Sequence, residues 1–122
     1  MNNPVGWFEI YVEDMSRAKD FYEAVFSLQL SKLESPGMEM WAFPMSSEGF
    51  GASGALVKMP AFQSGANSVL VYFSCKDCAV EAAKVSNAGG HLQKQKTSIG
   101  RYGFMSLGID SEGNMFGLHS MQ

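Results

Sequence analysis

The sequence contains the same succession of elements twice, and this repetition is the strongest constraint on its fold. In each half, a strand pattern ends just before an aspartate that can cap a helix, and the helix leads into three further strand patterns. The two aspartates, Asp14 and Asp77, are 63 residues apart. Because a period of about 60 residues is too long for a solenoid unit, we expect two βαβββ modules that share one core. An unrelated α+β sandwich with accidental symmetry is the alternative.

The first strand is predicted over residues 5–12, which are rich in aromatic and β-branched residues. Side chains alternate between the two faces of a strand, so one face here is purely apolar and the other combines a carboxylate with two aromatic rings. These faces consist of Phe8, Ile10 and Val12, and of Trp7, Glu9 and Tyr11, respectively. We expect the apolar face to pack under a helix and the mixed face to line a different environment.

The remaining elements follow from apolar periodicity and turn residues. Apolar residues recur at steps of three and four after Asp14 and predict a helix over 15–26. Further strands are predicted at 28–35, 38–44 and 55–59 in the first half, and at 68–74, 91–97, 103–109 and 115–120 in the second, with a helix from Asp77 to about Ala88. The chain therefore divides into module one (1–60), a linker (61–67) and module two (68–122).

Composition indicates one small domain with an ordinary core and excludes several function classes. The chain has 122 residues, of which 46% are hydrophobic and 17% charged. A net charge of −3, with only 9 Lys and Arg residues that form no run, argues against nucleic-acid binding. We expect no membrane span, because no apolar run approaches about 18 residues. The N-terminus lacks the features of a signal peptide, so we expect a cytoplasmic protein.

The two cysteines, Cys75 and Cys78, have a spacing that admits three interpretations. They could form a redox pair, contribute half of a zinc site, or be plain reduced thiols. A zinc site would need two more ligands, and neither His91 nor His119 has useful spacing. The small, rigid residues usual between thioredoxin-like cysteines are also absent. We therefore expect plain reduced thiols.

Three stretches together resemble one known superfamily. Residues 8–26 (F-E-I-Y-V-E-D-M-S-R-A-K-D-F-Y-E-A-V-F) form a strand-then-helix opening, and residues 69–77 (V-L-V-Y-F-S-C-K-D) form the same opening in module two. I-G-R-Y-G-F at 99–104 and D-S-E-G-N-M-F-G-L-H-S at 110–120 form a closing hairpin. In this order they resemble the vicinal oxygen chelate superfamily of glyoxalase I, bleomycin-resistance proteins and extradiol dioxygenases. The chain is most similar to its small, single-domain glyoxalase-like members.

The resemblance implies a fold without the metal site of the family's enzymes. It implies an α+β fold in which two βαβββ modules have curved mixed sheets that form a cleft, with the helices on the outer faces. Family enzymes bind a divalent metal through His or Gln on the first strand, His on the matching strand of module two, and Glu on a last strand. The corresponding positions here hold Trp7, Leu70 and Gly117, and residues 52–57 offer no good ligand. We therefore expect no metal and no other cofactor.

Glu9 is the most informative candidate for function. A carboxylate flanked by Trp7 and Tyr11 would be partly shielded from water. It could act as a general acid or base, or bind a cationic or hydroxyl-bearing ligand. It could also merely support the cleft by pairing with a donor such as Tyr11, Tyr72 or His119. A displaced metal site would combine Glu9 with His119, but two ligands are too few for a tight catalytic site.

Other candidates come from a loop and from the aromatic content. Arg101 and Tyr102 lie between two glycines, and Arg101 could meet a carboxylate or phosphate of a ligand or remain a solvated loop charge. A subset of the aromatic residues and of the 9 methionines could line an apolar cleft, although most of them will be core. The predicted ligand-binding residues are Trp7, Glu9, Tyr11, Trp41, Tyr72, Arg101, Tyr102, Phe104 and His119.

The leading hypothesis is a metal-free small-molecule-binding protein of the bleomycin-resistance kind. It would bind an apolar or aromatic ligand in the cleft between the modules, with Glu9 and Arg101 as polar contacts. One alternative is a metal-dependent lyase or dioxygenase with displaced ligands, and another is a metal-free enzyme that uses Glu9 as general base. The resemblance also implies a homodimer, and open sheet edges favour such pairing.

Overall fold

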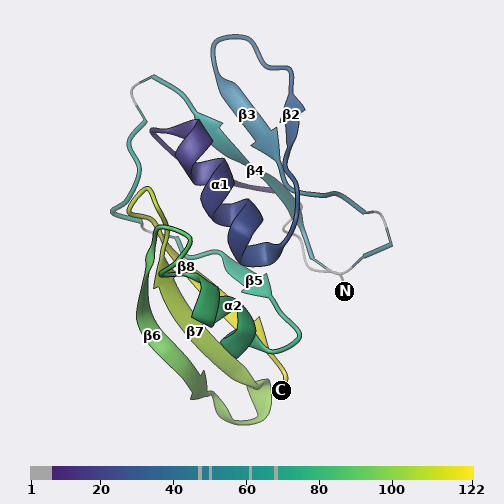
Figure 1. Ribbon diagram of the computed structural model, residues 1–122. Helices are drawn as coiled ribbons and strands as arrows, with labels where there is room; N and C mark the ends of the chain where they lie inside the picture. The colour runs from purple at the N-terminus through teal and green to yellow at the C-terminus, as the bar shows by residue number, and fades with distance from the viewer. Residues whose placement is uncertain (1–6, 47, 50, 61, 68) are drawn as a thin grey trace.

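The computed structural model shows two four-stranded mixed sheets with one helix each (Figure 1). It describes residues 7–46, 48–49, 51–60, 62–67 and 69–122. Each half has the order strand, helix and three strands, which confirms the predicted α+β fold of two βαβββ modules. Residues 1–6, including the predicted start of the first strand and the N-terminal segment, lie outside the described residues, as do Ala61 and Ser68 in the predicted linker and strand.

The elements have the following bounds. Module one contains β1 (Trp7–Tyr11), α1 (Met15–Phe26), β2 (Ser31–Leu33), β3 (Glu39–Ala42) and β4 (Ser53–Lys58). Module two contains β5 (Tyr72–Ser74), α2 (Cys78–Lys84), β6 (His91–Ser98), the 3₁₀ turn η1 (Gly100–Tyr102), β7 (Phe104–Ile109) and β8 (Met115–Ser120). No helix in the described part of the chain has the length and apolar character needed to cross a bilayer.

Helix α1 has the predicted bounds, whereas α2 is shorter than predicted. Asp14 caps α1 by accepting a hydrogen bond from the backbone N–H of Arg17. The prediction of a helix to Ala88 is wrong, because regular α-helix ends at Lys84 and residues 85–89 form turns. Gly89 then reverses the chain with a φ of 108°, a conformation that glycine adopts without strain.

The two sheets have the same strand order and equivalent registers. The order is β1-β4-β3-β2 in one sheet and β5-β8-β7-β6 in the other, and in each sheet the first pair is parallel and the rest antiparallel. Glu9 lies beside Ala55 in the first sheet, and Tyr72 lies beside Gly117 in the second. Glu9 and Tyr72 are therefore equivalent positions, 63 residues apart.

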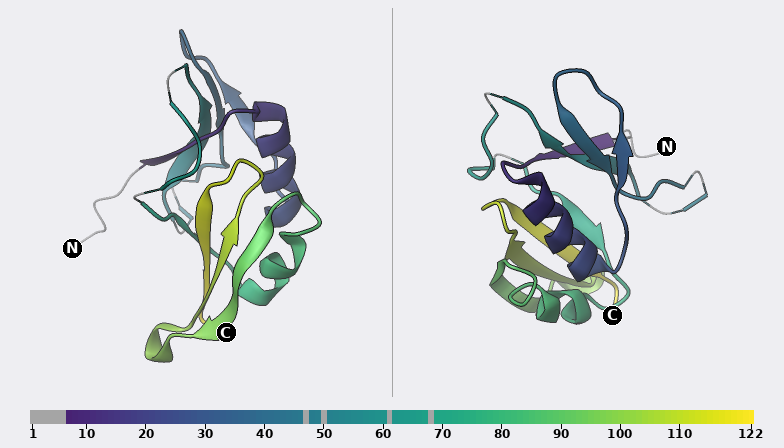
Figure 2. Two further views of the ribbon diagram at one scale, coloured as in Figure 1. Left: turned by 90° about the vertical axis from the view of Figure 1, so that its left-hand side faces the viewer. Right: turned by 45° about the horizontal axis from the view of Figure 1, so that its top comes forward.

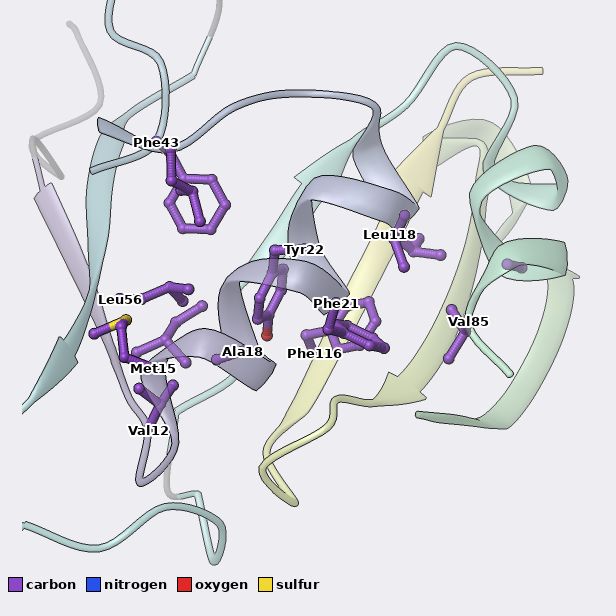
Figure 3. Close-up of a cluster of buried hydrophobic side chains, with 14 of the residues drawn as sticks. Val12, Met15, Ala18, Phe21, Tyr22, Phe43, Leu56, Val85, Phe116 and Leu118 are labelled. Carbon is purple, nitrogen blue, oxygen red and sulfur yellow. The ribbon is translucent and has the colours of Figure 1, made fainter. Parts of the chain in front are cut away.

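One continuous core joins the modules through α1. Both helices lie on the same side of the two sheets (Figure 2, left). Phe21 and Tyr22 of α1 are fully buried, and both rings pack against Phe116 of β8. The Tyr22 ring also packs against Phe43 of module one, so α1 occupies the interface between the modules (Figure 3). Ile10 of β1 and Val12, the residue after this strand, are buried in this core, as predicted for the apolar face.

The turn between β7 and β8 holds the first turn of α1. Glu112 in this turn is buried, and its carboxylate accepts hydrogen bonds from the backbone N–H groups of Glu13 and Asp14 at 3.1 and 2.8 Å. The Arg17 guanidinium forms an ion pair with the same carboxylate. Burial alone would raise the pKa of Glu112, but the hydrogen bonds from Arg17, Asp14 and Glu13 outweigh burial and lower it.

Two more side chains of this turn complete the connection between the modules. Asp110 is 3% exposed and accepts a hydrogen bond of 2.6 Å from the Tyr22 hydroxyl. Burial, followed by the charge and hydrogen bond of Asp110, raises the pKa of Tyr22 well above its ordinary value. Asn114 donates to the backbone carbonyl of Tyr11 at 3.0 Å. The turn at 110–114 thus closes one module and bonds to the strand–helix junction of the other.

Candidate functional site

A pocket of about 300 Å³ lies at the seam between the modules, where β1 of module one meets the start of β8 and the segment before β5 of module two. Its lining is mostly apolar with a few polar groups. The described residues that line it are Glu9, Ile10, Tyr11, Tyr22, Gln63, Gly65, Asn67, Val69, Val71, Asn114, Met115 and Phe116. A second, more open hollow of about 580 Å³ lies on module one and contains none of the predicted ligand-binding residues.

Glu9 is the centre of a three-residue cluster on the face of β1 that points away from the helices. We call this side of each sheet its open face. Trp7 Nε1 donates a hydrogen bond to Glu9 Oε2 at 3.2 Å, and the Tyr11 hydroxyl donates to Oε1 at 2.8 Å. The hydrogen bond to Glu9, followed by burial, raises the pKa of Tyr11, so its hydroxyl remains a donor at neutral pH. Of the three donors considered as partners for Glu9 (Tyr11, Tyr72 and His119), the structure shows a bond from Tyr11. The predicted shielding of Glu9 from water is wrong, because its side chain is exposed.

Aromatic rings flank this carboxylate on both sides. Trp7 is 39% exposed, and the Tyr11 ring stacks on Phe62 with centroids 4.9 Å apart and planes 17° apart. The sequence predicted Trp7 and Tyr11 by strand alternation. Phe62 was missed, because it lies in the linker, where no periodicity indicates which way a side chain points.

On module two, Tyr72 covers the position of Gly117. A Cβ atom built on Gly117 would lie 2.3 Å from two carbons of the Tyr72 ring. The ring therefore fills the space into which a side chain at position 117 would project. Tyr72 is 48% exposed on the open side of its sheet.

Three of the predicted ligand-binding residues lie together near the C-terminal end of β8. His119 Nε2 lies 2.7 Å from the backbone carbonyl of Tyr102, so this nitrogen carries a hydrogen and donates. Arg101 Nη2 donates to the Tyr102 hydroxyl at 3.0 Å, and both side chains are exposed. None of the three lines the seam pocket, which meets β8 at its other end, at Met115. The structure therefore does not bring Arg101 to Glu9.

Two predicted residues lie on the helix side of their sheets. Trp41 pairs with buried Leu56, and the Lys19 ammonium of α1 lies 3.4 Å from the centre of the Trp41 ring. Phe104 pairs with Ser120, whose hydroxyl accepts a hydrogen bond from the first residue of α2. Since Glu9 faces the opposite side of its sheet, the structure separates Trp41 and Phe104 from it.

The donors on the open faces do not fit a divalent metal. Four strands present open-face positions near the seam, namely Trp7, Glu9, Tyr11, Ser53, Ala55, Val57, Tyr72, Ser74, Met115, Gly117 and His119. Only Glu9 and His119 are good ligands among these. Within the described residues, no three His, Cys, Asp or Glu side chains are grouped closely enough to hold an ion. The Tyr72 ring also fills the space that a metal-binding side chain at position 117 would need.

The cysteines occupy core positions of the strand–helix junction. Cys75 and Cys78 lie 63 residues after Val12 and Met15, which are 1% and 4% exposed. Both are free thiols, and Cys78 is fully buried. Burial, followed by the nearby Glu81 carboxylate, raises the pKa of Cys75 to about 12. The C-K-D-C spacing therefore reflects two apolar junction positions shared by the modules rather than a reactive pair.

Comparisons with known proteins agree with this architecture. The family model described as Glyoxalase/Bleomycin resistance protein/Dioxygenase superfamily matches residues 5–116. Glyoxalase I from Zea mays is similar in structure at 19% identity and a TM-score of 0.76, over 97% of this chain and 46% of that one. This chain therefore spans about half the length of the maize protein. A search of curated protein sequences finds no match.

Shorter proteins match along nearly their whole length. TnmS3, an antibiotic-binding protein from Streptomyces sp. CB03234, is 22% identical with a TM-score of 0.72, over 98% of this chain and 96% of that one. A superfamily member from Sphaerobacter thermophilus DSM 20745 is 19% identical with a TM-score of 0.70, over 98% of both chains. At these identities the likeness establishes the fold alone.

Proposed function

Because the chain belongs to the glyoxalase/bleomycin resistance protein/dioxygenase superfamily, we propose that it binds a small apolar or aromatic molecule in the pocket between its modules, without a divalent metal. The lining of that pocket is the observation that carries the proposal. Val69, Val71 and Met115 supply apolar surface from module two, and Glu9 and Tyr11 supply a carboxylate and a ring from module one. Ligand sites typically combine such apolar walls with a few polar groups.

The size of the pocket and the residues that line it favour a small ligand. A volume of about 300 Å³ is at the lower end of the range for ligand pockets. The Tyr11 ring, which stacks on Phe62, lines the pocket and offers it an aromatic surface. Met115 is flexible and can adapt to ligands of different outline. A single ring system would suit this space.

Two further observations support binding without a metal. Among the described residues, the donor set on the open faces lacks a third ligand beside Glu9 and His119, which favours a function without the metal chemistry of the superfamily's enzymes. TnmS3 binds an antibiotic on the same fold, which supports a binding role by analogy.

A paired-variant binding experiment tests the proposal. A panel of aromatic compounds is screened by thermal shift in EDTA, and hits are titrated by calorimetry. Val71→Trp fills the pocket and should weaken binding by at least about tenfold. Val80→Trp places the same side chain on the exposed surface of α2 and should leave affinity unchanged. Equal affinities for the two folded variants, or hits that depend on divalent metal, would contradict the proposal.

Glu9 is also the residue on which a metal-free reaction would depend. It is the only carboxylate among the described residues that line the pocket. If the bound compound is turned over, Glu9→Gln should abolish turnover while the variant keeps the melting temperature of the parent. If the folded variant still turns the compound over, Glu9 is not the general base.

We further propose a homodimer. Large apolar side chains are exposed near the seam, including Val69 at 69%, Leu70 at 39% and Tyr72 at 48%. Such surfaces often mark association. Light scattering should give the mass of two chains, and the mass of one chain would contradict this proposal.

A further inference from the structure

We propose that the ligand is an organic cation, which the carboxylate of Glu9 holds between the rings of Trp7 and Tyr11. This inference rests on the proposed function and specifies the ligand class of the same pocket. It follows from three observations: the charge of the pocket, the buried acid behind its wall, and the way this chain pairs carboxylates, rings and cations elsewhere.

The pocket carries an uncompensated negative charge. Glu9 is the only charged side chain among the described residues that line it, and no Lys, Arg or His is present there. The donors that bond to Glu9, the Trp7 indole and the Tyr11 hydroxyl, are both neutral. The ion pairs within the described residues join Arg17 to Glu112 and Lys96 to Asp77 and do not include Glu9.

A second carboxylate lies behind the wall of the pocket. Asp110 is buried and accepts hydrogen bonds from the Tyr22 hydroxyl and from Asn114 Nδ2, and both of these residues line the pocket. Its described donors are neutral, and it forms no ion pair in the described part of the chain. A low-dielectric wall transmits this charge to the pocket, and so favours a cation there.

Two other places in the chain show a lysine over an aromatic ring that has a carboxylate nearby. On β3, Trp41 Nε1 donates to Glu39 two residues away, as Trp7 does to Glu9, and the Lys19 ammonium lies 3.4 Å from the centre of the Trp41 ring. In module two, the Lys96 ammonium lies 2.7 Å from an Asp77 oxygen and 4.6 Å from the centre of the Phe104 ring. In each case a lysine of the same module lies over the ring, and Lys96 also forms an ion pair with the carboxylate.

The Trp7–Glu9 pair differs from these two in one respect. No lysine or arginine lies over the Trp7 ring among the described cation–ring contacts. Glu9 of this pair lines the seam pocket, and Trp7 lies beside it on the face of β1 turned away from the helices, so a ligand in the pocket can supply the cation. A flat organic cation satisfies the carboxylate and the rings at once and fits the apolar walls, whereas a strongly hydrated inorganic ion would not use the rings.

A matched pair of probes tests this inference. The probes are 1-methylquinolinium, which carries a permanent positive charge, and quinoline, which is neutral at neutral pH and nearly the same size. Calorimetric titrations at low ionic strength compare the parent chain with Glu9→Gln, which keeps the shape of the side chain and removes its charge. Glu39→Gln is the control, because it changes the equivalent pair on the helix side of the sheet.

The parent should bind the cation more tightly than the neutral probe. Glu9→Gln should raise the Kd of the cation about tenfold and leave that of quinoline within about twofold. Glu39→Gln should change neither. Added salt should weaken binding of the cation only, because Glu9 is exposed.

The outcomes separate the two proposals. If both probes bind equally, or if Glu9→Gln leaves the cation affinity unchanged, the ligand class is wrong. If neither probe binds but neutral compounds from the panel bind in a Val71-dependent way, the ligand class is again wrong and the proposed function stands. If no compound binds at the seam pocket, both proposals fail.

Discussion

The two modules share one strand order but differ in how the start of each helix is held. The N-cap of α2, Asp77, bonds to its own helix and to Lys96, and the first N–H group of that helix donates to Ser120. All of these partners belong to module two. Helix α1 has its own cap, but the backbone around that cap and Arg17 bond to Glu112 across the seam. Module one therefore depends on module two for the start of its helix.

The same asymmetry appears in the core. Phe116 of β8 is 1% exposed and packs against the rings of Phe21, Tyr22 and Phe26 on α1. The equivalent position of module one is Gly54, where the Phe8 ring leaves no room for a side chain. Repetition of a module thus fixes the strand order, while the contacts that join two copies arise from residues present in only one of them.

Of the substitutions that test this asymmetry, removal of the Phe116 ring should lower the free energy of unfolding most. Phe116→Ala should lower the free energy of unfolding by about 3–5 kcal/mol, because it leaves a cavity against α1. Phe104→Ala changes a half-buried ring of the same module that faces α2. This variant should lose less free energy of unfolding than Phe116→Ala. Urea unfolding followed by fluorescence and circular dichroism measures both. Equal losses in the two variants would show that the cross-module contact has no special weight.

Removing the charge of Glu112 should have the next largest effect. Glu112→Gln should lower the free energy of unfolding by about 1–3 kcal/mol, because charged hydrogen bonds to Arg17 and to the start of α1 are weakened. The matched variant in module two is Asp77→Asn, whose side chain is 43% exposed and whose loss should be smaller. A larger loss of unfolding free energy in Asp77→Asn than in Glu112→Gln would contradict the proposed dependence of module one on module two.

The contribution of Glu112 should also depend on pH. Its pKa is below the ordinary value of 4.5 in the folded chain, so the folded state keeps the carboxylate charged where the unfolded state protonates it. The stability it contributes is complete above pH 4.5 and is lost as pH falls through the lowered pKa. The difference in melting temperature between the parent and Glu112→Gln should therefore be constant near neutral pH and shrink in acid. A difference that grows in acid would contradict the assignment.

The cysteines of module two should be inert in the folded protein. The pKa of Cys75 is raised to about 12, so this thiol supplies little thiolate near neutral pH. Cys78 is fully buried, so a reagent in solution does not reach it. A chromogenic disulfide reagent at mildly alkaline pH should react slowly with the native chain and with two thiols after denaturation. Rapid reaction of one thiol in the native state would show that module two has a reactive site that module one lacks.

Local sequence patterns predicted the helices and strands but not the long-range contacts between the modules. The three- and four-residue spacing after Asp14 predicts α1 with its observed bounds, and alternation along β1 correctly separates Glu9 from Ile10. Neither pattern indicates that Glu112 would reach α1, since that contact joins residues 98 positions apart. Such contacts depend on how the two sheets are docked, which no local period records.

The candidate site was predicted in part for the same reason. Trp7, Glu9 and Tyr11 follow from alternation on one strand, and the structure joins them by hydrogen bonds. Trp41 was selected for its ring, but the antiparallel register with β4 turns it toward α1. The exposure of Glu9 could not be predicted, because it depends on how far module two covers β1.

A crystal structure of the chain with a ligand from the panel, grown in the presence of a divalent metal, tests metal-free binding at the seam most directly. We predict density for the ligand against Tyr11, Val71 and Met115, with its cationic group near Glu9 and no ion on the open faces. An ion coordinated by three or more protein atoms between the sheets, or a ligand seated away from the seam, would contradict the account.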